Sequence, residues 1–313
     1  MTVREVEHDT VVDASASDVY RVIADVANWP LIFPPAVHVD QRDLTGNQER
    51  VRVWASVDGE VRHWTSRRTL QPAAGRITFR QEVPVPPVAA MGGTWIVEPL
   101  GEGRCRVRLL LTYRAKDDDA ELLARIDSAV DHGSPVELDA LRANLELVLG
   151  SPELTLVFRE SVRIDAPVSD VYDFVAEARH WRDRLPHIVD VDVREADFGL
   201  QRLRLETLTG DGSSQTTESL RVRFPHRLVA FKQTTLPALL RLHTGRWEFD
   251  EDITGITTAT VHHTVVLNPR QIPGVLGPEA GIREAGDFVR SVLGATSRTT
   301  LEFAKDHAER ARV

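Results

Sequence analysis

The chain has 313 residues, of which 42% are hydrophobic and 27% are charged, and its formal net charge is −9. This length exceeds that of a typical domain and favours two domains, and the composition is that of a globular protein. The negative charge argues against nucleic acid as a partner, because phosphate binding needs clustered Lys and Arg. A single cysteine, Cys105, excludes an internal disulfide and a cysteine cluster for metal binding.

Two further features concern localisation and metal binding. Residues 1–9 are acidic and polar, whereas a signal peptide has a basic start and then an apolar run. No apolar stretch reaches the roughly 20 residues that a membrane-spanning helix needs. No His-x-x-x-His spacing predicts a metal site. We therefore expect a soluble, cytoplasmic protein that binds neither membranes nor metal.

The first half of the chain predicts a strand, a short helix, an antiparallel meander and a closing helix. The first strand covers residues 4–12, and Ser17 is a suitable N-cap for a helix that ends at Trp29 and Pro30. Alternating runs then predict five strands, at residues 50–57, 61–70, 76–83, 93–98 and 105–113. The closing helix is marked by apolar residues at helical spacing, which are Leu138, Leu141, Leu145, Val148 and Leu149.

This order of elements repeats once along the chain. The string VDASASDVY at residues 12–20 returns as IDAPVSDVY at residues 164–172. The two strings begin 152 residues apart, since 164 minus 12 is 152. Solenoid and propeller units are only about 20–50 residues long, so a repeat with this spacing indicates a duplicated domain. We predict a first domain at residues 1–150 and a second at residues 151–313, with a boundary in the Gly-Ser-Pro string that follows the helical pattern.

The space between such a sheet and its helix decides what each domain does. If side chains fill the space, the domain is a packing unit, and if it stays open, it is a binding or active site. Strand alternation places Trp64, Ser66 and Arg68 on one face. Two interpretations are open: Trp64 lies in the core while Arg68 reaches solvent at the strand end, or all three face the open space.

The second copy repeats part of this pattern. Ser219 and Arg221 stand where Ser66 and Arg68 stand in the first copy, but Thr217 replaces the tryptophan. The shared Ser-x-Arg pair indicates either a shared function or common ancestry alone. The loss of tryptophan makes the second domain the candidate for a structural role.

Longer strings in both halves carry a family resemblance. In the first half these are WP at residues 29–30 with Phe33, WTSRR at 64–68 and PPVAAMGGTW at 86–95. In the second half they are RLPH at 184–187, TESLRV at 217–222, FPH at 224–226, LPAL at 236–239, HTG at 243–245 and HTVVLNP at 263–269. With these strings the chain resembles the didomain aromatase/cyclases of bacterial type II polyketide synthases.

The resemblance implies an α+β fold of two tandem helix-grip domains, related to START and Bet v1 proteins. Each would be a curved antiparallel sheet around a long C-terminal helix, with an internal pocket. It further implies a poly-β-ketone substrate on an acyl carrier protein, already reduced by a ketoreductase. The implied reaction closes or dehydrates the first ring, between C7 and C12, without a cofactor. The ketosynthase and ketoreductase of the same pathway are further implied partners.

The chemistry of ring closure suits Arg68 and Ser66, and by repetition Arg221 and Ser219. A guanidinium stays charged and can stabilise an enolate or alkoxide, and a hydroxyl can donate to the same oxygen. Ser66 is not expected to be a nucleophile, because the string around it lacks a nucleophile elbow. The general base stays open between Glu82, if it is buried, and His132 near the closing helix.

Ten residues are predicted to bind substrate, mostly because flat apolar rings suit a planar product. They are Trp29, Phe33, Trp54, Trp64, Phe79, Glu82, Met91, Trp95, His187 and Trp247. Taken singly, most of these aromatic residues are more often core than contact.

Some features leave a second function open. Relatives carry Asn-Ser near the closing helix, whereas this chain has Gly133-Ser134 and Thr296-Ser297. The Pro- and Gly-rich residues 268–281 form either a lid or a surface loop. Because the same fold hosts carriers and enzymes, the alternative is a non-catalytic module that binds the polyketide and protects it.

Overall fold

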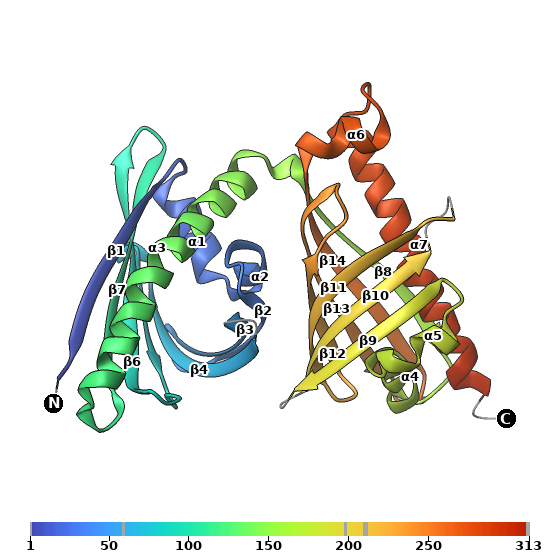
Figure 1. The fold of residues 1–313 in the computed structure, drawn as a ribbon, viewed down its shortest axis with the longest axis horizontal. Coiled ribbons are helices and arrows are strands. Elements are labelled where there is room, and N and C mark those ends of the chain that lie inside the picture. Colours follow the sequence, from blue (N-terminus) through green and yellow to red (C-terminus); the bar gives the residue numbers. More distant parts are fainter. Residues whose placement is uncertain (1, 58–59, 197–198, 209–211, 311–313) are drawn as a thin grey trace. The chain divides into compact units, whose positions relative to one another are not determined.

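The computed structural model describes residues 2–57, 60–196, 199–208 and 212–310. The chain divides into two units, Met1–Pro152 and Glu153–Val313. Each unit contains a seven-stranded antiparallel sheet, short helices and one long C-terminal helix (Figure 1). We term the sheet face that packs on the long helix the concave face, and this face with its helix a cup.

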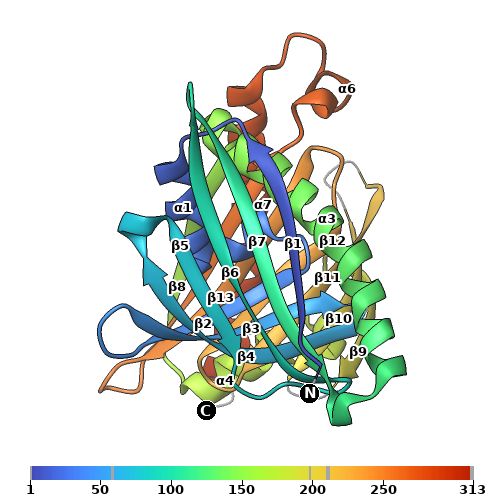
Figure 2. The same ribbon diagram turned by 90° about the vertical axis from the view of Figure 1, so that its left-hand side faces the viewer.

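In the first unit, the second to seventh strands pair in sequence order, and the first strand pairs with the seventh. The sheet order is β1-β7-β6-β5-β4-β3-β2. Figure 2 shows β1, β7 and β6 running side by side. The elements are β1 (Arg4–Val12), α1 (Ala16–Ala24), α2 (Trp29–Ile32), β2 (Ala36–Asp43), β3 (Gln48–Val57), β4 (Glu60–Gln71), β5 (Arg76–Gln81), β6 (Val88–Gly101), β7 (Arg104–Ala115) and α3 (Ala120–Gly150).

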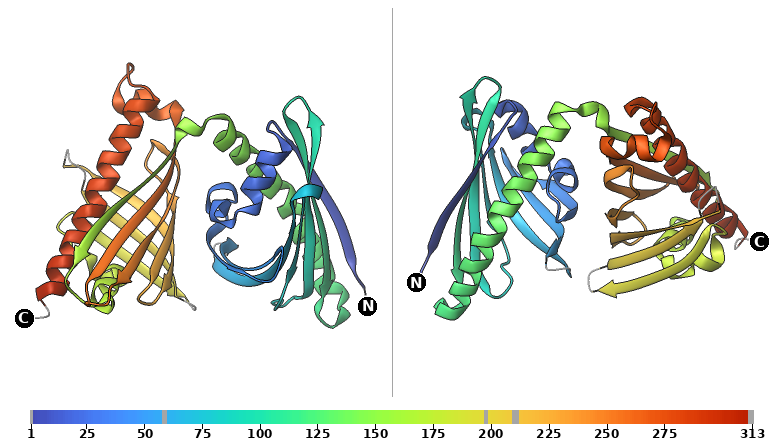
Figure 3. Two further views of the ribbon diagram at one scale, coloured as in Figure 1. Left: turned by 180° about the vertical axis from the view of Figure 1, so that it is seen from behind. Right: turned by 45° about the horizontal axis from the view of Figure 1, so that its top comes forward.

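The second unit repeats this topology, with sheet order β8-β14-β13-β12-β11-β10-β9. Its long helix runs along the sheet in both views of Figure 3. The elements are β8 (Thr155–Ile164), α4 (Val168–Ala176), α5 (Trp181–Arg184), β9 (Ile188–Ala196), β10 (Leu200–Leu208), β11 (Ser214–Phe224), β12 (Leu228–Thr235), β13 (Leu240–Glu251), β14 (Thr257–Leu267), α6 (Ile272–Leu276) and α7 (Ile282–Arg310).

Apolar burial holds each long helix on its sheet. In the first unit, Ile126 and Val130 of α3 pack in one cluster with Tyr113 and Ala115 of β7. The Tyr113 hydroxyl also donates to Asp127 of α3 at 2.8 Å. In the second unit, one apolar cluster joins α4, α7 and the sheet. The predicted fold class, two tandem helix-grip domains of the α+β type, is confirmed.

Several predicted element bounds differ from the structure. The helix α1 is capped by Ser15, whose side chain accepts from the Asp18 amide, and not by Ser17. The strand β2 was not predicted, because its burial does not alternate. The helix α3 begins at Ala120 and continues through Pro135. The string Gly133-Ser134-Pro135, unlike the Gly-Ser-Pro string at residues 150–152, therefore lies inside the helix.

Candidate active sites in the two cups

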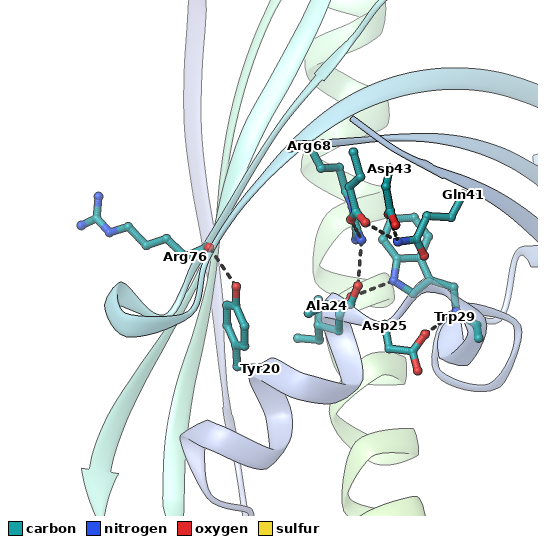
Figure 4. Close-up of polar contacts among 11 residues, drawn as sticks. Tyr20, Ala24, Asp25, Trp29, Gln41, Asp43, Arg68 and Arg76 are labelled. Carbon is teal, nitrogen blue, oxygen red and sulfur yellow. Dashed lines mark hydrogen bonds and ion pairs between the residues drawn. The ribbon is translucent and has the colours of Figure 1, made fainter. Parts of the chain in front are cut away.

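Arg68 lies on the concave face of β4 and is 1% exposed. Its Nη2 atom donates to the carbonyl oxygen of Ala24, the last residue of α1, at 2.7 Å (Figure 4). The same atom donates to the carboxylate of Glu49. Its guanidinium carbon lies 5.1 Å from the ring centre of Trp29. Burial lowers the pKa of Arg68, whereas the carboxylate of Glu49 raises it. The guanidinium therefore joins β4 to the end of α1, and the protein itself covers it.

Glu49 is the partner that sequence reasoning missed. It is buried on β3 directly across from Arg68. Its second carboxylate oxygen accepts a hydrogen bond from the Gln41 side chain at 2.6 Å. The signal was present in the sequence, since Glu49 alternates with the buried residues Val51 and Val53.

Ser66 and Gln81 form a polar pair on the concave face beside Arg68. They lie across from each other on β4 and β5. Among the described residues the Ser66 hydroxyl has no hydrogen-bond partner, and the Gln81 amide nitrogen lies 3.8 Å from the sulfur of Met91. Trp64 and Phe79 share this face and are partly exposed, so solvent reaches it.

The other predicted aromatic residues divide between the core and the opposite face. The Phe33 ring lies 5.3 Å from Trp29 and 5.9 Å from Trp95, and Phe33 and Trp95 are buried. Trp54 pairs with His63 and not with Trp64, so it lies on the convex face of the sheet. Its predicted place in the interior slot is therefore wrong.

Neither candidate for the general base is buried in the first cup. Glu82 forms ion pairs with Arg50 at 2.7 Å and Arg67 at 3.2 Å on the convex side. These hydrogen bonds lower the pKa of Glu82, the opposite of what a buried base requires. His132 is exposed, and its ring bonds to the Ser128 carbonyl at 2.7 Å.

Arg221 occupies the place of Arg68 in the second cup but has a different partner. It is 2% exposed, donates to the Val175 carbonyl at 2.6 Å and lies 5.2 Å from the ring centre of Trp181. Gln201 stands where Glu49 stands in the first cup, and within the described residues Arg221 forms no ion pair. Burial lowers the pKa of Arg221 to about 9, so it stays protonated at neutral pH.

Ser219 lies across from Gln233 of β12, as Ser66 lies across from Gln81. Gln233 begins a row of polar side chains that reaches α7. It bonds to His243, His243 bonds to His263, and His263 bonds to Ser297, each at 2.9 Å. The sequence analysis did not single out these histidines, although His263 alternates with the buried residues Val261 and Val265.

The remaining predicted residues of the second unit lie elsewhere. Trp247 is buried in the apolar cluster of α4, α7 and the sheet. His187 lies in the turn between α5 and β9 and is partly buried, and this burial lowers its pKa. Neither forms a hydrogen bond to the row from Gln233 to Ser297.

Comparison with known proteins agrees with this duplicated arrangement. Models of a family described as polyketide cyclase/dehydrase and lipid transport match residues 12–126 and 155–309. A granaticin polyketide synthase bifunctional cyclase/dehydratase from Streptomyces virginiae is 43% identical, over 95% of this chain and 98% of its own length. The chain belongs to the polyketide cyclase/dehydrase family.

Further members match over nearly the whole chain. The actinorhodin polyketide synthase bifunctional cyclase/dehydratase from Streptomyces coelicolor is 38% identical, over 96% of this chain and 95% of that protein. The crystal structure of the di-domain ARO/CYC BexL from the BE-7585A pathway is 58% identical, with a TM-score of 0.92 over 98% of this chain and 99% of that one. The di-domain ARO/CYC StfQ from the steffimycin pathway is 30% identical, with a TM-score of 0.87 over 98% and 100%.

This polyketide cyclase/dehydrase is thus a didomain aromatase/cyclase and an enzyme of the cyclase/dehydratase type, as the resemblance implied. Among its described residues, no helix combines the length and the apolar composition needed to cross a bilayer. In the same part of the chain, no three His, Cys, Asp or Glu side chains are grouped as metal ligands would be.

Proposed function

We propose that this enzyme closes and aromatises the first ring, between C7 and C12, of a ketoreduced poly-β-ketone carried by an acyl carrier protein. We propose that it acts in the cytoplasm and without a cofactor. The observation that carries the proposal is the similarity, over nearly the full length, to proteins named bifunctional cyclase/dehydratases of polyketide synthases. Each concave face also carries a serine, a glutamine across from it and a buried arginine, which supports the proposal. These residues are Ser66, Gln81 and Arg68 in the first cup and Ser219, Gln233 and Arg221 in the second.

The chemistry fits what these side chains can supply. A carbon between two carbonyls is acidic, so ring closure mainly requires chain folding and stabilisation of the new alkoxide, and aromatisation then requires loss of water. In the first cup, Trp64 and Phe79 offer partly exposed rings, and Ser66 offers an unused hydroxyl. Arg68 is covered, so we propose that it acts through its charge and by holding β4 against α1. In the second cup Arg221 holds β11 against α4 in the same way, and we propose that Ser219 offers its hydroxyl to the step that loses water.

Reconstitution of the pathway tests this function. The purified enzyme is added to a minimal synthase with its carrier protein, with and without the ketoreductase, and the first ring is identified by mass spectrometry and NMR. We expect an aromatic C7–C12 ring when enzyme and ketoreductase are both present. The same product mixture with and without the enzyme, or a first ring closed between other carbons, would contradict the proposal.

We further propose that basic residues near the first cup contact the acidic carrier protein. Arg67 is bound to Glu82, and Arg104 lies 4.0 Å from Glu102. Arg80 is exposed, forms no ion pair with any described residue and borders a depression of about 700 Å³ lined by residues of β5, β6, β7 and β1. Arg80→Ala should raise the KM for carrier-bound substrate and leave that for a free mimic unchanged. Equal effects on both substrates would exclude docking at this residue.

A further inference from the structure

The second cup contains a continuous row of hydrogen bonds across three strands and the long helix. The Gln233 side-chain oxygen bonds to Nδ1 of His243, Nε2 of His243 to Nδ1 of His263, and Nε2 of His263 to the Ser297 hydroxyl, each at 2.9 Å. His243, His263 and Ser297 are 3–5% exposed. The rings of Phe231 and Phe158 pack against the two imidazoles.

Neutral imidazoles give this row a direction. Burial lowers the pKa of His243 to about 3 and that of His263 to about 4, so neither is charged at neutral pH. A neutral imidazole has one donor and one acceptor nitrogen. An amide oxygen only accepts, so Nδ1 of His243 donates to Gln233, and its Nε2 accepts from Nδ1 of His263. The Ser297 hydroxyl then donates to Nε2 of His263.

This direction leaves the amide nitrogen of Gln233 as the end of the row. Among the described residues this nitrogen has no acceptor. Ser219 lies directly across the strand pair, and its hydroxyl has no partner in the described part of the chain either. Both residues are partly exposed on the concave face. Two unused hydrogen-bond donors thus lie side by side.

The first cup shows what the row replaces. Phe79, Gly93 and Leu111 are cross-strand partners in the first sheet, as Phe231, Gly245 and His263 are in the second. In this register Met91 stands in the place of His243, and Leu111 in the place of His263. The Gln81 amide nitrogen points toward the Met91 sulfur, 3.8 Å away. Among the described residues, the first cup therefore has no row that fixes its glutamine in the same orientation.

We propose that Gln233, His243, His263 and Ser297 make the second cup a binding site for an uncharged carbonyl or enol oxygen, held between the Gln233 amide nitrogen and the Ser219 hydroxyl. The histidines and Ser297 are positioning residues, and Gln233 and Ser219 contact the ligand. This inference rests on the proposed function for the identity of the natural ligand, a carbonyl-rich chain or ring.

A nucleophilic role for Ser297 is the competing explanation, because a serine, a histidine and an orienting group stand in order. The lowered pKa of His263 makes it a poor base at neutral pH, since a general base works best with a pKa near the working pH. Ser297 is also buried against the sheet. The row is therefore suited to orienting an amide and not to activating a hydroxyl.

The tautomers test the direction of the row in the full-length protein. Two-bond nitrogen–proton NMR correlations at neutral pH should show His243 and His263 protonated at Nδ1. Ser297→Thr, which keeps the hydroxyl, should preserve this pattern, and Ser297→Ala should change the His263 signals. Protonation of both rings at Nε2 would mean that Gln233 donates to His243, and would overturn the proposal.

Ligand binding tests the site without any polyketide turnover. The binding site can therefore prove wrong while the proposed cyclase activity is confirmed, and the cyclase activity can prove wrong while the site is confirmed. The probe is 2-acetyl-1-naphthol, a neutral aromatic ketone, titrated while the His243 and His263 signals are followed. Gln233→Met should weaken binding by about 3- to 10-fold, as expected for one lost hydrogen bond. The double variant His243→Met/His263→Leu, which recreates the first cup's residues, should weaken it similarly.

Gln271→Met is the matched control, because Gln271 is exposed and lies in the turn after β14. Its affinity for the probe should equal that of the unaltered protein. Imidazole signals that do not move with the probe, or an unchanged affinity in Gln233→Met, would overturn the assignment of the site.

Discussion

The two buried arginines show how one position can be stabilised in two ways. Both guanidiniums bond to a carbonyl at the end of a short helix and lie over a tryptophan ring. The C-terminal end of a helix carries a partial negative charge, which favours a cation there. Arg68 has the carboxylate of Glu49 in addition, whereas Arg221 has only the helix end and the ring among the residues that the structure describes.

Glu49→Gln and Arg68→Ala should therefore differ in their cost. Removal of Arg68 leaves Glu49 buried without a counter-ion, which should lower the free energy of unfolding by about 3–5 kcal/mol. Glu49→Gln recreates the cross-strand neighbours Gln201 and Arg221 of the second unit, where the arginine is buried without a carboxylate opposite it, and should cost less. Urea denaturation of the full chain measures both. Equal losses would contradict this prediction, because they would mean that Arg68 without its carboxylate costs as much as Glu49 without its cation.

Strand alternation in the sequence was enough to place Ser66, Arg68 and Trp64 on one face. It was not enough to show their partners, because cross-strand neighbours are set by the register between two strands, which the alternation of one strand does not reveal. In the second sheet a bulge after Glu218 also shifts the register. Trp54 was misplaced for a related reason: aromatic residues are apolar on either face of a sheet, so composition does not reveal which face they occupy.

At the scale of elements, a glycine allows each sheet to pack an aromatic ring over the neighbouring strand. A Cβ atom on Gly93 would lie 2.9 Å from the ring of Phe79, and one on Gly245 would lie 2.7 Å from the ring of Phe231. In both cases a backbone carbonyl of the next strand is closer still. The duplication has thus preserved the same close approach twice.

Gly93→Ala and Gly245→Ala should each destabilise their own unit by about 1–3 kcal/mol, because backbone and ring must both move. Gly133→Ala is the control, since a Cβ there meets no atom within 4 Å and the residue lies inside α3. That change should stabilise by about 0.5–1 kcal/mol, owing to the higher helix propensity of alanine. Denaturation midpoints measure all three variants, and a neutral Gly93→Ala would show that the strands can separate easily.

The junction of β13, β14 and α7 should make stability depend on pH. His243 and His263 have folded pKa values of about 3 and 4, below the ordinary value of about 6.5, because burial disfavours the charged form. The neutral form is favoured in the fold, so the contribution of these two histidines to stability is present above the unfolded pKa of about 6.5 and is lost as the pH falls toward the folded values. The loss approaches about 1.4 kcal/mol per pH unit for each histidine.

Urea denaturation between about pH 7.5 and 5 measures this loss. This range extends from about one unit above the ordinary pKa of histidine to more than one unit below it. The double variant His243→Met/His263→Leu should have a flatter profile, because both titrating groups are gone. Identical profiles for the two proteins would assign the pH dependence to other groups.

The helical and strand patterns predicted most elements because burial on one face leaves a clear period in the sequence. The start of α3 was hidden, since Gly133 and Pro135 resemble a break, and Asp119, which caps the helix through the amides of Glu121 and Leu122, lies well before the leucine pattern. The Pro- and Gly-rich residues 268–281 include α6, so they are not a structureless loop.

At the scale of the molecule, the two copies keep one topology but have diverged on their concave faces. The first cup has a tryptophan, a methionine and a leucine where the second has Thr217, His243 and His263. An apolar face suits the folding of a long chain, and a face with fixed donors suits a polar oxygen. We therefore expect the two cups to carry out different tasks.

Single variants in each cup should separate these tasks in the reconstituted synthase. Ser66→Ala should reduce ring closure by about 10-fold or more, as for loss of a hydrogen bond to a developing oxyanion. Ser219→Ala should leave ring closure intact and slow the loss of water, so that a hydrated, non-aromatic ring accumulates and is detected one water heavier by mass spectrometry. If both variants gave the same product profile, the cups would share one task, and the divergence of their concave faces would have to serve substrate holding instead.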